Sequence, residues 1–335
     1  MAQTDFQGQF VWHELLCSDS SAASAFYTRV LPWTAQPFSP GSPYLVFKSA
    51  SGKPVAGAMS LSDEARAMGT GPHWCSYIGV ADVDASVAQA VRLGARILRP
   101  AADMPAVGRA AVLADPEGAR FGVFRPLAGS GGSAAGEPGF AWCELAARSR
   151  ETALAFYQQL FGWELRAPID MGGGFQYQSF GLGGVDLGGA YTIRADRPMP
   201  PAWCPYAAVS SADETAGKVV AAGGQLAHGP VSVPGGGRIV QFFDLQHAMF
   251  AVHSMAAKPA ATPVKKSAAK PVKKAAKKAA RKAARKAVKK PVKKAPRKAV
   301  KKQAAKRAAK LQRKVARKAG RKVARKAARK PARKK

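Results

Sequence analysis

Two short apolar segments carry the side chains best placed to do chemistry. Each segment has strand character, and the period-two alternation of a strand puts three side chains of each on one face: Trp12, Glu14 and Leu16 in the first, and Trp142, Glu144 and Ala146 in the second. A carboxylate on an inward strand face is costly without a partner. We therefore expect Glu14 and Glu144 to bind a ligand or to form a buried ion pair.

Two further strand-like segments repeat a second pattern, in which a cysteine and a tyrosine share a face. The complete set of candidate ligand-binding residues is Trp12, Glu14, Cys75, Tyr77, Arg109, Trp142, Glu144, Cys204, Tyr206 and Arg238. An aromatic wall with one carboxylate and one phenol suits a small, partly apolar ligand that carries a cationic or hydrogen-bonding group. In the alternative interpretation the tryptophans fill a core, and each glutamate pairs with Arg109 or Arg238.

These matching segments belong to a tandem duplication. Trp12–Leu15 recurs at 142–145, Ala25–Tyr27 recurs at 155–157, and Trp74–Tyr77 recurs at 203–206. The spacing is 130 residues at first and 129 later, which indicates a single-residue deletion. We expect one domain at 8–126, a flexible linker at 127–138 and a second domain at 139–255.

Each copy follows the order strand, helix, strands, twice. In the first copy, Asp19 is a good N-cap for a helix that runs through Leu31, and a second helix is expected at 84–93. Strands are expected at 10–16, 44–47, 55–59, 77–80, 109–113 and 121–124. The sequence therefore predicts an α+β fold in which helices cover one face of a curved sheet and the other face forms a cup.

This order of elements resembles the vicinal oxygen chelate superfamily of glyoxalases, bleomycin-resistance proteins and extradiol dioxygenases. The resemblance rests on the N-cap followed by Ala-x-x-Phe-Tyr, the Pro-Trp or Gly-Trp that ends the first helix, and the Asp-Pro-Glu-Gly turn at 115–118. It implies two glyoxalase-like domains, each built of two βαβββ units that form a cupped sheet.

Members of this superfamily that do chemistry usually hold a divalent metal with His, Gln or Glu on paired strands. Alignment on the helix N-cap, the Phe-Tyr pair and the closing turn gives the corresponding residues here: Trp12, Gly57, Cys75 and Gly122 in the first copy, and Trp142, Gly189, Cys204 and Ala251 in the second. One cysteine per copy supplies one ligand where three or four are needed. We therefore expect no metal, no cofactor and no assigned catalytic residue.

Other side chains offer little support for catalysis. No base lies at a spacing that would activate Cys75 or Cys204, and a buried free cysteine usually behaves as a small hydrophobe. His13 is adjacent to Trp12, so on a strand it points away from the cup, toward the helix layer. We expect the five histidines to be structural or exposed.

The charge of the chain is divided unevenly. Its 335 residues carry a net charge of +33, but residues 257–335 contain 36 Lys+Arg and no acid, which leaves 17 basic and 20 acidic residues in the body. This tail of Lys, Arg, Ala, Val and Pro resembles the carboxy-terminal tails of linker histones and of bacterial Lys/Ala/Pro-rich histone-like proteins, and it is expected to be disordered when free. Counterion release would bind it to DNA without sequence preference, with RNA and polyphosphate as alternatives.

The expected DNA contacts are paired basic residues along this tail: Lys273, Lys274, Lys277, Lys278, Arg281, Lys282, Arg285, Lys286, Arg297, Lys298, Arg317, Lys318, Arg321, Lys322, Arg325 and Lys326. The chain has no apolar run long enough to span a bilayer and no secretory-signal pattern in its first ten residues. We expect a cytoplasmic, nucleoid-associated protein whose cups bind an unknown small molecule. The alternatives are a glyoxalase- or dioxygenase-type enzyme (a lyase or an oxidoreductase, with Glu14 or Glu144 as general base) and a protein that sequesters a drug or metabolite.

Overall fold

The structure is a computed structural model of the chain, and it describes residues 6–127 and 139–255. The predicted linker and the basic tail lie outside the described residues. All described residues fall in one compact unit. None of the helices that the structure describes is long and apolar enough to cross a membrane.

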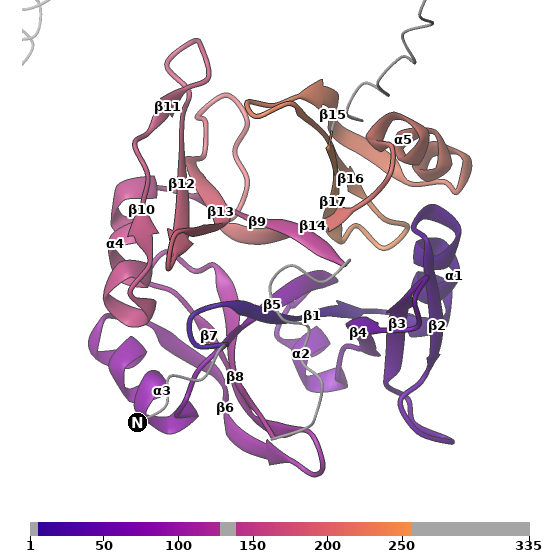
Figure 1. The fold of residues 1–335 in the computed structure, drawn as a ribbon. Coiled ribbons are helices and arrows are strands. Elements are labelled where there is room, and N and C mark those ends of the chain that lie inside the picture. Colours follow the sequence, from indigo (N-terminus) through magenta and orange to yellow (C-terminus); the bar gives the residue numbers. More distant parts are fainter. Residues whose placement is uncertain (1–5, 128–138, 256–335) are drawn as a thin grey trace, which may run out of the picture. The chain divides into compact units, whose positions relative to one another are not determined.

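Each copy forms one mixed sheet with helices (Figure 1). The first copy contains β1 (Phe10–Cys17), α1 (Ser20–Val30), β2 (Trp33–Pro37), β3 (Leu45–Ser49), β4 (Pro54–Ser60), α2 (Asp63–Ala67), β5 (His73–Gly79), α3 (Val83–Arg92), β6 (Arg96–Met104), β7 (Gly108–Ala114) and β8 (Arg120–Pro126). The second contains β9 (Phe140–Ala147), α4 (Arg150–Phe161), β10 (Glu164–Leu165), β11 (Ile169–Asp170), β12 (Gln176–Leu182), β13 (Val185–Thr192), β14 (Ala202–Ala208), α5 (Ala212–Ala221), β15 (Gln225–Ser232), β16 (Gly237–Phe243) and β17 (Met249–Met255).

The strand order is the same in both sheets. It is β2-β3-β4-β1-β5-β8-β7-β6 in the first copy and β10-β12-β13-β9-β14-β17-β16-β15 in the second, where β11 also pairs with β12. In the first copy, β1 pairs in parallel with β4 and antiparallel with β5, so the two halves of the copy join at β1 and β5. The prediction of two tandem α+β copies, each with a sheet built of two similar halves, is confirmed.

Local sequence signals account for the helix boundaries. The Asp19 carboxylate accepts hydrogen bonds from the backbone N–H groups of Ser21 and Ala22 and so caps α1 as predicted. Ser149 caps α4 in the same way. Gly94 follows α3 with φ +97°, a left-handed conformation that glycine adopts without steric cost. The strands β2 and β6 and the short helix α2 were not predicted.

The helix layer is shared between the copies. Helix α1 packs with β16 and β17 of the second copy, where Phe26 and Tyr27 meet Phe242 and Phe250. Helix α4 packs in the same way on the first copy. Accordingly, α1 lies beside α5, and α3 lies beside α4 (Figure 1). Most of the apolar core therefore lies between the copies.

Two matching hydrogen-bond relays fasten this shared core. Trp74 Nε1 donates to the Tyr27 hydroxyl at 2.9 Å, and that hydroxyl donates to Asp244 Oδ2 of the second copy at 3.0 Å. The second relay has the same geometry and runs in the opposite sense, from Trp203 through Tyr157 to Asp115. Because both aspartates are buried and belong to closing turns, each turn is tied to the first helix of the other copy.

Candidate functional site

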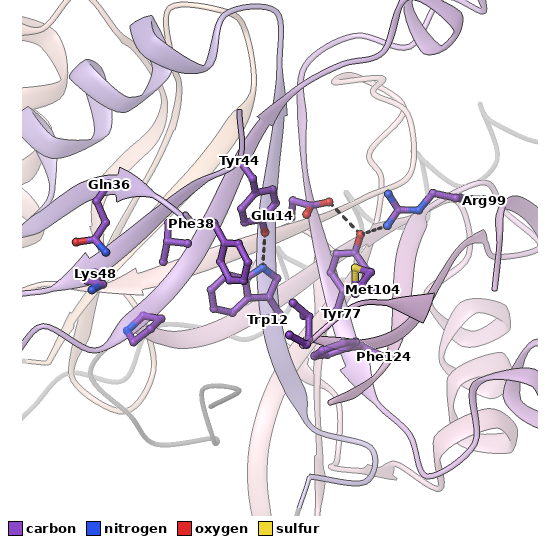
Figure 2. A pocket seen from close by; sticks show the side chains of 14 residues that line it. Trp12, Glu14, Gln36, Phe38, Tyr44, Lys48, Tyr77, Arg99, Met104 and Phe124 are labelled. Carbon is purple, nitrogen blue, oxygen red and sulfur yellow. Dashed lines mark hydrogen bonds between the residues drawn. The ribbon is translucent and has the colours of Figure 1, made fainter. Parts of the chain in front are cut away.

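The concave face of the first sheet holds a pocket of about 550 Å³. Its floor comes from β1 and β5, where Trp12 lies opposite Tyr77, and Glu14 follows two residues along the same face. One wall comes from β2 and β3 and the other from the β6–β7 hairpin, so the two edges of the sheet face each other across the floor. The lining residues are Trp12, Glu14, Gln36, Phe38, Tyr44, Val46, Lys48, Pro54, Tyr77, Arg99, Met104, Ala106, Val107 and Phe124 (Figure 2).

Polar groups in this first cup are joined by hydrogen bonds. Arg99 Nη2 donates to the Tyr77 hydroxyl at 3.0 Å, and the Tyr77 hydroxyl donates to Glu14 Oε2 at 3.0 Å. Trp12 Nε1 donates to the Tyr44 hydroxyl at 2.9 Å (Figure 2). The aromatic rings are therefore held in one orientation, with a carboxyl group and a guanidinium at the same end of the pocket.

Burial dominates the electrostatics of Glu14. Desolvation raises its pKa above the ordinary value because a charged carboxylate is disfavoured away from water. The positive charge of Arg99 and hydrogen bonds from Tyr77 and Tyr44 act in the opposite direction and lower the pKa. The first cup thus places a carboxyl group of raised pKa next to a permanent cation.

The second cup repeats the floor with a different polar partner. Trp142 Nε1 donates to the Tyr177 hydroxyl at 2.7 Å, and the Tyr206 hydroxyl donates to Glu144 Oε1 at 2.9 Å. Where the first cup uses an arginine, Gln241 Nε2 donates to Glu144 Oε1 at 2.7 Å. Burial raises the pKa of Glu144 to about 7, although hydrogen bonds from Tyr206, Tyr177 and Gln241 act to lower it.

The residues at the predicted metal positions do not fit a metal ion. Gly57, Gly122 and Gly189 offer no ligating side chain, and a Cβ added at each would overlap a tyrosine ring or hydroxyl, from Tyr44, Tyr77 and Tyr177 respectively. Across residues 6–127 and 139–255, no three His, Cys, Asp or Glu side chains gather closely enough to hold a metal. The glycines make room for phenols at the positions where ligands would stand.

The matched cysteines are packing residues in this fold. Cys75 and Cys204 are both buried beside the aromatic floor. Burial raises the pKa of Cys75 to about 12, and burial likewise raises the pKa of Cys204. A thiol with so high a pKa stays protonated near neutral pH and is a poor nucleophile.

The two arginines expected in the cups lie elsewhere. Arg109 forms hydrogen-bonded ion pairs with Asp84 at 2.8 Å and with Asp103 at 2.9 Å. Arg238 forms the same kind of pair with Asp213. The alternative in which Glu14 or Glu144 pairs with these arginines is wrong. The guanidinium of each Gly-Arg motif instead reaches an aspartate on a helix of the same copy, α3 for Arg109 and α5 for Arg238.

Four side chains that the sequence analysis did not select complete the cups: Tyr44, Arg99, Tyr177 and Gln241. The sequence does contain a signal for the two tyrosines, because Gly57 and Gly189 leave space for a large neighbouring side chain. The sequence contains no comparable signal for Arg99. Strand β6 is mostly exposed, and its pairing with β7 shifts register on both sides of Arg99. Such irregularities re-aim a side chain in a way that strand alternation does not predict.

His13 points away from the cup, as predicted, and lies where the first strands of the two copies meet. Its Nδ1 is 2.9 Å from Ser76 Oγ, and its ring lies against that of Phe140, tilted by 33°, with centroids 3.9 Å apart. Burial lowers the pKa of His13 to about 3, so the ring is neutral. It is a packing residue of the shared core.

Comparisons with known proteins agree with this architecture. A glyoxalase-like domain model matches residues 11–124, and a glyoxalase/bleomycin resistance protein/dioxygenase superfamily model matches residues 139–252. Among solved structures, the Mn(II)-bound glyoxalase of Novosphingobium aromaticivorans superposes with TM-score 0.52 and 14% identity, over 74% of this chain and 82% of that one. The 2,3-dioxygenase LapB of a Pseudomonas species gives 0.51 and 11%, over 75% and 94%. At these identities the likeness concerns the fold.

Sequence relatives are closer. The chain is 33% identical over 252 residues to "Putative glyoxylase CFP32" of Mycobacterium bovis, which covers 73% of this chain and 94% of the relative. It is 30% identical over 258 residues to the anthracycline biosynthesis protein DnrV of Streptomyces peucetius, with 73% and 92% covered. The chain belongs to the glyoxalase/bleomycin resistance protein/dioxygenase superfamily.

Proposed function

We propose that the first cup binds a small, partly aromatic molecule without help from a metal ion. The observation that carries this proposal is the pocket of about 550 Å³, in which Trp12, Tyr44, Tyr77 and Phe124 surround a hydrogen-bonded carboxyl group. Its volume lies in the range of drug-sized ligand sites, which combine apolar walls with a few placed polar groups. Relatives named for anthracycline biosynthesis support a flat aromatic ligand.

Thermal shift of the full chain with a water-soluble anthraquinone tests this proposal. The probe should raise the unfolding temperature of the wild-type protein, because a ligand that binds only the folded state stabilises it by mass action. Trp12→Leu removes one aromatic wall of the first cup and should abolish the shift. Trp142→Leu is the matched control in the second cup and should keep it. A shift that survives Trp12→Leu would place the ligand elsewhere.

A metal-independent enzyme is the second candidate function, with Glu14 as general base. It is favoured by the position of this carboxyl group inside the pocket, where burial raises its pKa above the ordinary value. Elemental analysis of protein purified without chelator separates it from the metal-dependent enzymes. A near-stoichiometric metal content in the wild-type protein that is lost in the Glu14→Gln variant would support a metal-dependent mechanism instead. Conversion of a bound aromatic probe, lost in the same variant, would favour catalysis over sequestration.

We further propose that residues 257–335 tether the protein to DNA or another polyanion. The support is their 36 Lys+Arg residues without an acid, against a body in which acids slightly exceed bases. Neutralising about ten phosphates gives a log–log salt slope near −9. Band shifts at several salt concentrations should show tight, salt-sensitive binding by the full chain and little by a chain that ends at Met255, the last residue that the structure describes. Equal binding by both would refute the tether.

A further inference from the structure

Among the facing positions that differ between the edge strands of the two cups, one pair supplies the polar partner of each floor. On β6 and β7 of the first copy, Arg99 lies opposite Val112. On β15 and β16 of the second copy, the corresponding residues are His228 and Gln241. The duplication has therefore placed a long cation on the outer strand of one cup and a neutral amide on the inner strand of the other.

This difference changes the charge at the polar end of each floor. In the first cup, Arg99 donates to Tyr77 and so brings a permanent positive charge to the Tyr77–Glu14 pair. In the second cup, the Gln241 amide donates both to Tyr206, at 2.6 Å, and to Glu144, at 2.7 Å. The second cup is thus held by neutral donors, while the first contains a charged one.

The first cup also holds more positive than negative side chains. Its ionisable lining is Lys48 and Arg99 against the single carboxyl of Glu14, apart from the high-pKa phenols. Among the described residues, neither Lys48 nor Arg99 forms a direct ion pair with a carboxylate, whereas Arg109 and Arg238 outside the cups do.

Arg99 still has donors to offer a ligand. A guanidinium carries five N–H groups in a planar fork. The structure gives that of Arg99 one hydrogen-bond acceptor within the described residues, the Tyr77 hydroxyl. The remaining fork matches the geometry of a carboxylate, which accepts two parallel charge-assisted hydrogen bonds.

We propose that the ligand of the first cup is an aromatic acid. Its flat ring lies among Trp12, Phe38 and Tyr44, and its carboxylate, or a similar planar anion, accepts hydrogen bonds from Arg99. The second cup, with Gln241 in place of this cation, does not select acids. This inference rests on the proposed binding function, and it makes Arg99 the residue that determines ligand charge in the first cup.

Two nearly isosteric probes test the inference: 2-naphthoate and its neutral amide, 2-naphthamide. Their affinities for the full chain are compared by calorimetric titration in about 0.3 M salt, where charges farther from the ligand than a Debye length are largely screened. The wild-type protein should bind the acid about tenfold more tightly than the amide, because a charge-assisted hydrogen bond stabilises a complex more than a hydrogen bond between neutral groups does. Arg99→Gln should bring this ratio close to one, because the acid then loses its cationic partner.

Arg96→Gln is the matched control. Arg96 is an exposed arginine on the same strand and does not line the pocket, so this change removes the same charge and should leave the ratio at about ten. Binding of the acid by the tail is common to all variants and therefore does not mimic the effect. A double variant, Arg99→His with Val112→Gln, gives the first cup the residues of the second and should also lose the preference for the acid.

The possible outcomes distinguish failure of this inference about charge from failure of the proposed binding function of the first cup. If both probes bind equally to the wild type and Trp12→Leu abolishes both, the cup is an aromatic site, and the inference about charge is refuted. If the acid is preferred and Arg99→Gln keeps that preference, Arg99 is not the selecting residue, and the inference is again refuted. If neither probe binds at all, the proposed binding function is refuted together with it.

Discussion

The carboxyl group of Glu144 should make the body less stable as the pH rises, and Glu144→Gln should remove this dependence. Glu144 is only 8% exposed, and burial raises its pKa from an ordinary 4.5 to about 7. The unfolded chain therefore loses this proton before the folded protein does. Between about pH 4.5 and pH 7 the free energy of unfolding falls as the pH rises, and above pH 7 this contribution is constant.

The size of the effect follows from the shift. One pKa unit corresponds to about 1.4 kcal/mol, so the full penalty above pH 7 is about 3 kcal/mol. Glutamine has nearly the same shape, and its carbonyl oxygen accepts the hydrogen bonds that Tyr206 and Gln241 now donate to Glu144. The neutral variant should match the wild type at pH 4.5 and exceed its stability by up to about 3 kcal/mol at pH 8.

Urea unfolding of both proteins, followed by tryptophan fluorescence from pH 4.5 to pH 8, measures this difference. Glu14→Gln is the natural comparison, because the charge of Arg99 favours the ionised form of Glu14, so a smaller gain at pH 8 is expected. If the wild type and Glu144→Gln keep a constant difference across the whole range, Glu144 does not titrate near neutral pH, and the reasoning from burial is wrong.

Three further substitutions should change the stability of the body or the binding of a probe in predictable ways. Tyr157→Phe removes the hydrogen bond to buried Asp115 and should cost about 1–3 kcal/mol in a single unfolding transition of the whole body, observed by calorimetry. Gly57→Ala places a methyl group against the Tyr44 hydroxyl and should weaken probe binding to the first cup in the thermal-shift assay by displacing that ring. Arg109→Gln breaks ion pairs with exposed partners and should change the free energy of unfolding by less than about 1 kcal/mol, with unchanged probe binding.

Much of the fold could be read from local patterns in the chain. The capping side chains of Asp19 and Ser149 and the period-two strands act over a few residues, so the predicted helices and strands match the structure closely. Strand alternation also put Trp12 and Glu14 on the cup face, where the pocket is found. The strand β6 was missed because almost all of its side chains are exposed and show no alternation.

The polar partners in the cups could not be predicted in this way. In the alternative interpretation Glu14 would pair with Arg109, the first residue of a predicted strand; it instead meets Tyr77 and the nearby charge of Arg99. Which arginine reaches the floor depends on irregular register between β6 and β7 and on the curl that brings the sheet edges together. Both are consequences of packing over the entire sheet.

The chain by itself determined the duplication, the order of its elements, the glycines and cysteines at the metal positions, and the separation of a slightly acidic body from a strongly basic tail. Each of these is a property of residue types and spacings. Only the tertiary structure decided that the two copies share one core, through the Tyr27–Asp244 and Tyr157–Asp115 hydrogen bonds, and that the two cups differ in charge. The physical reason is that these contacts join residues from 22 positions apart, for Arg99 and Tyr77, to 217 positions apart, for Tyr27 and Asp244, where local sequence pattern sets neither distance nor direction.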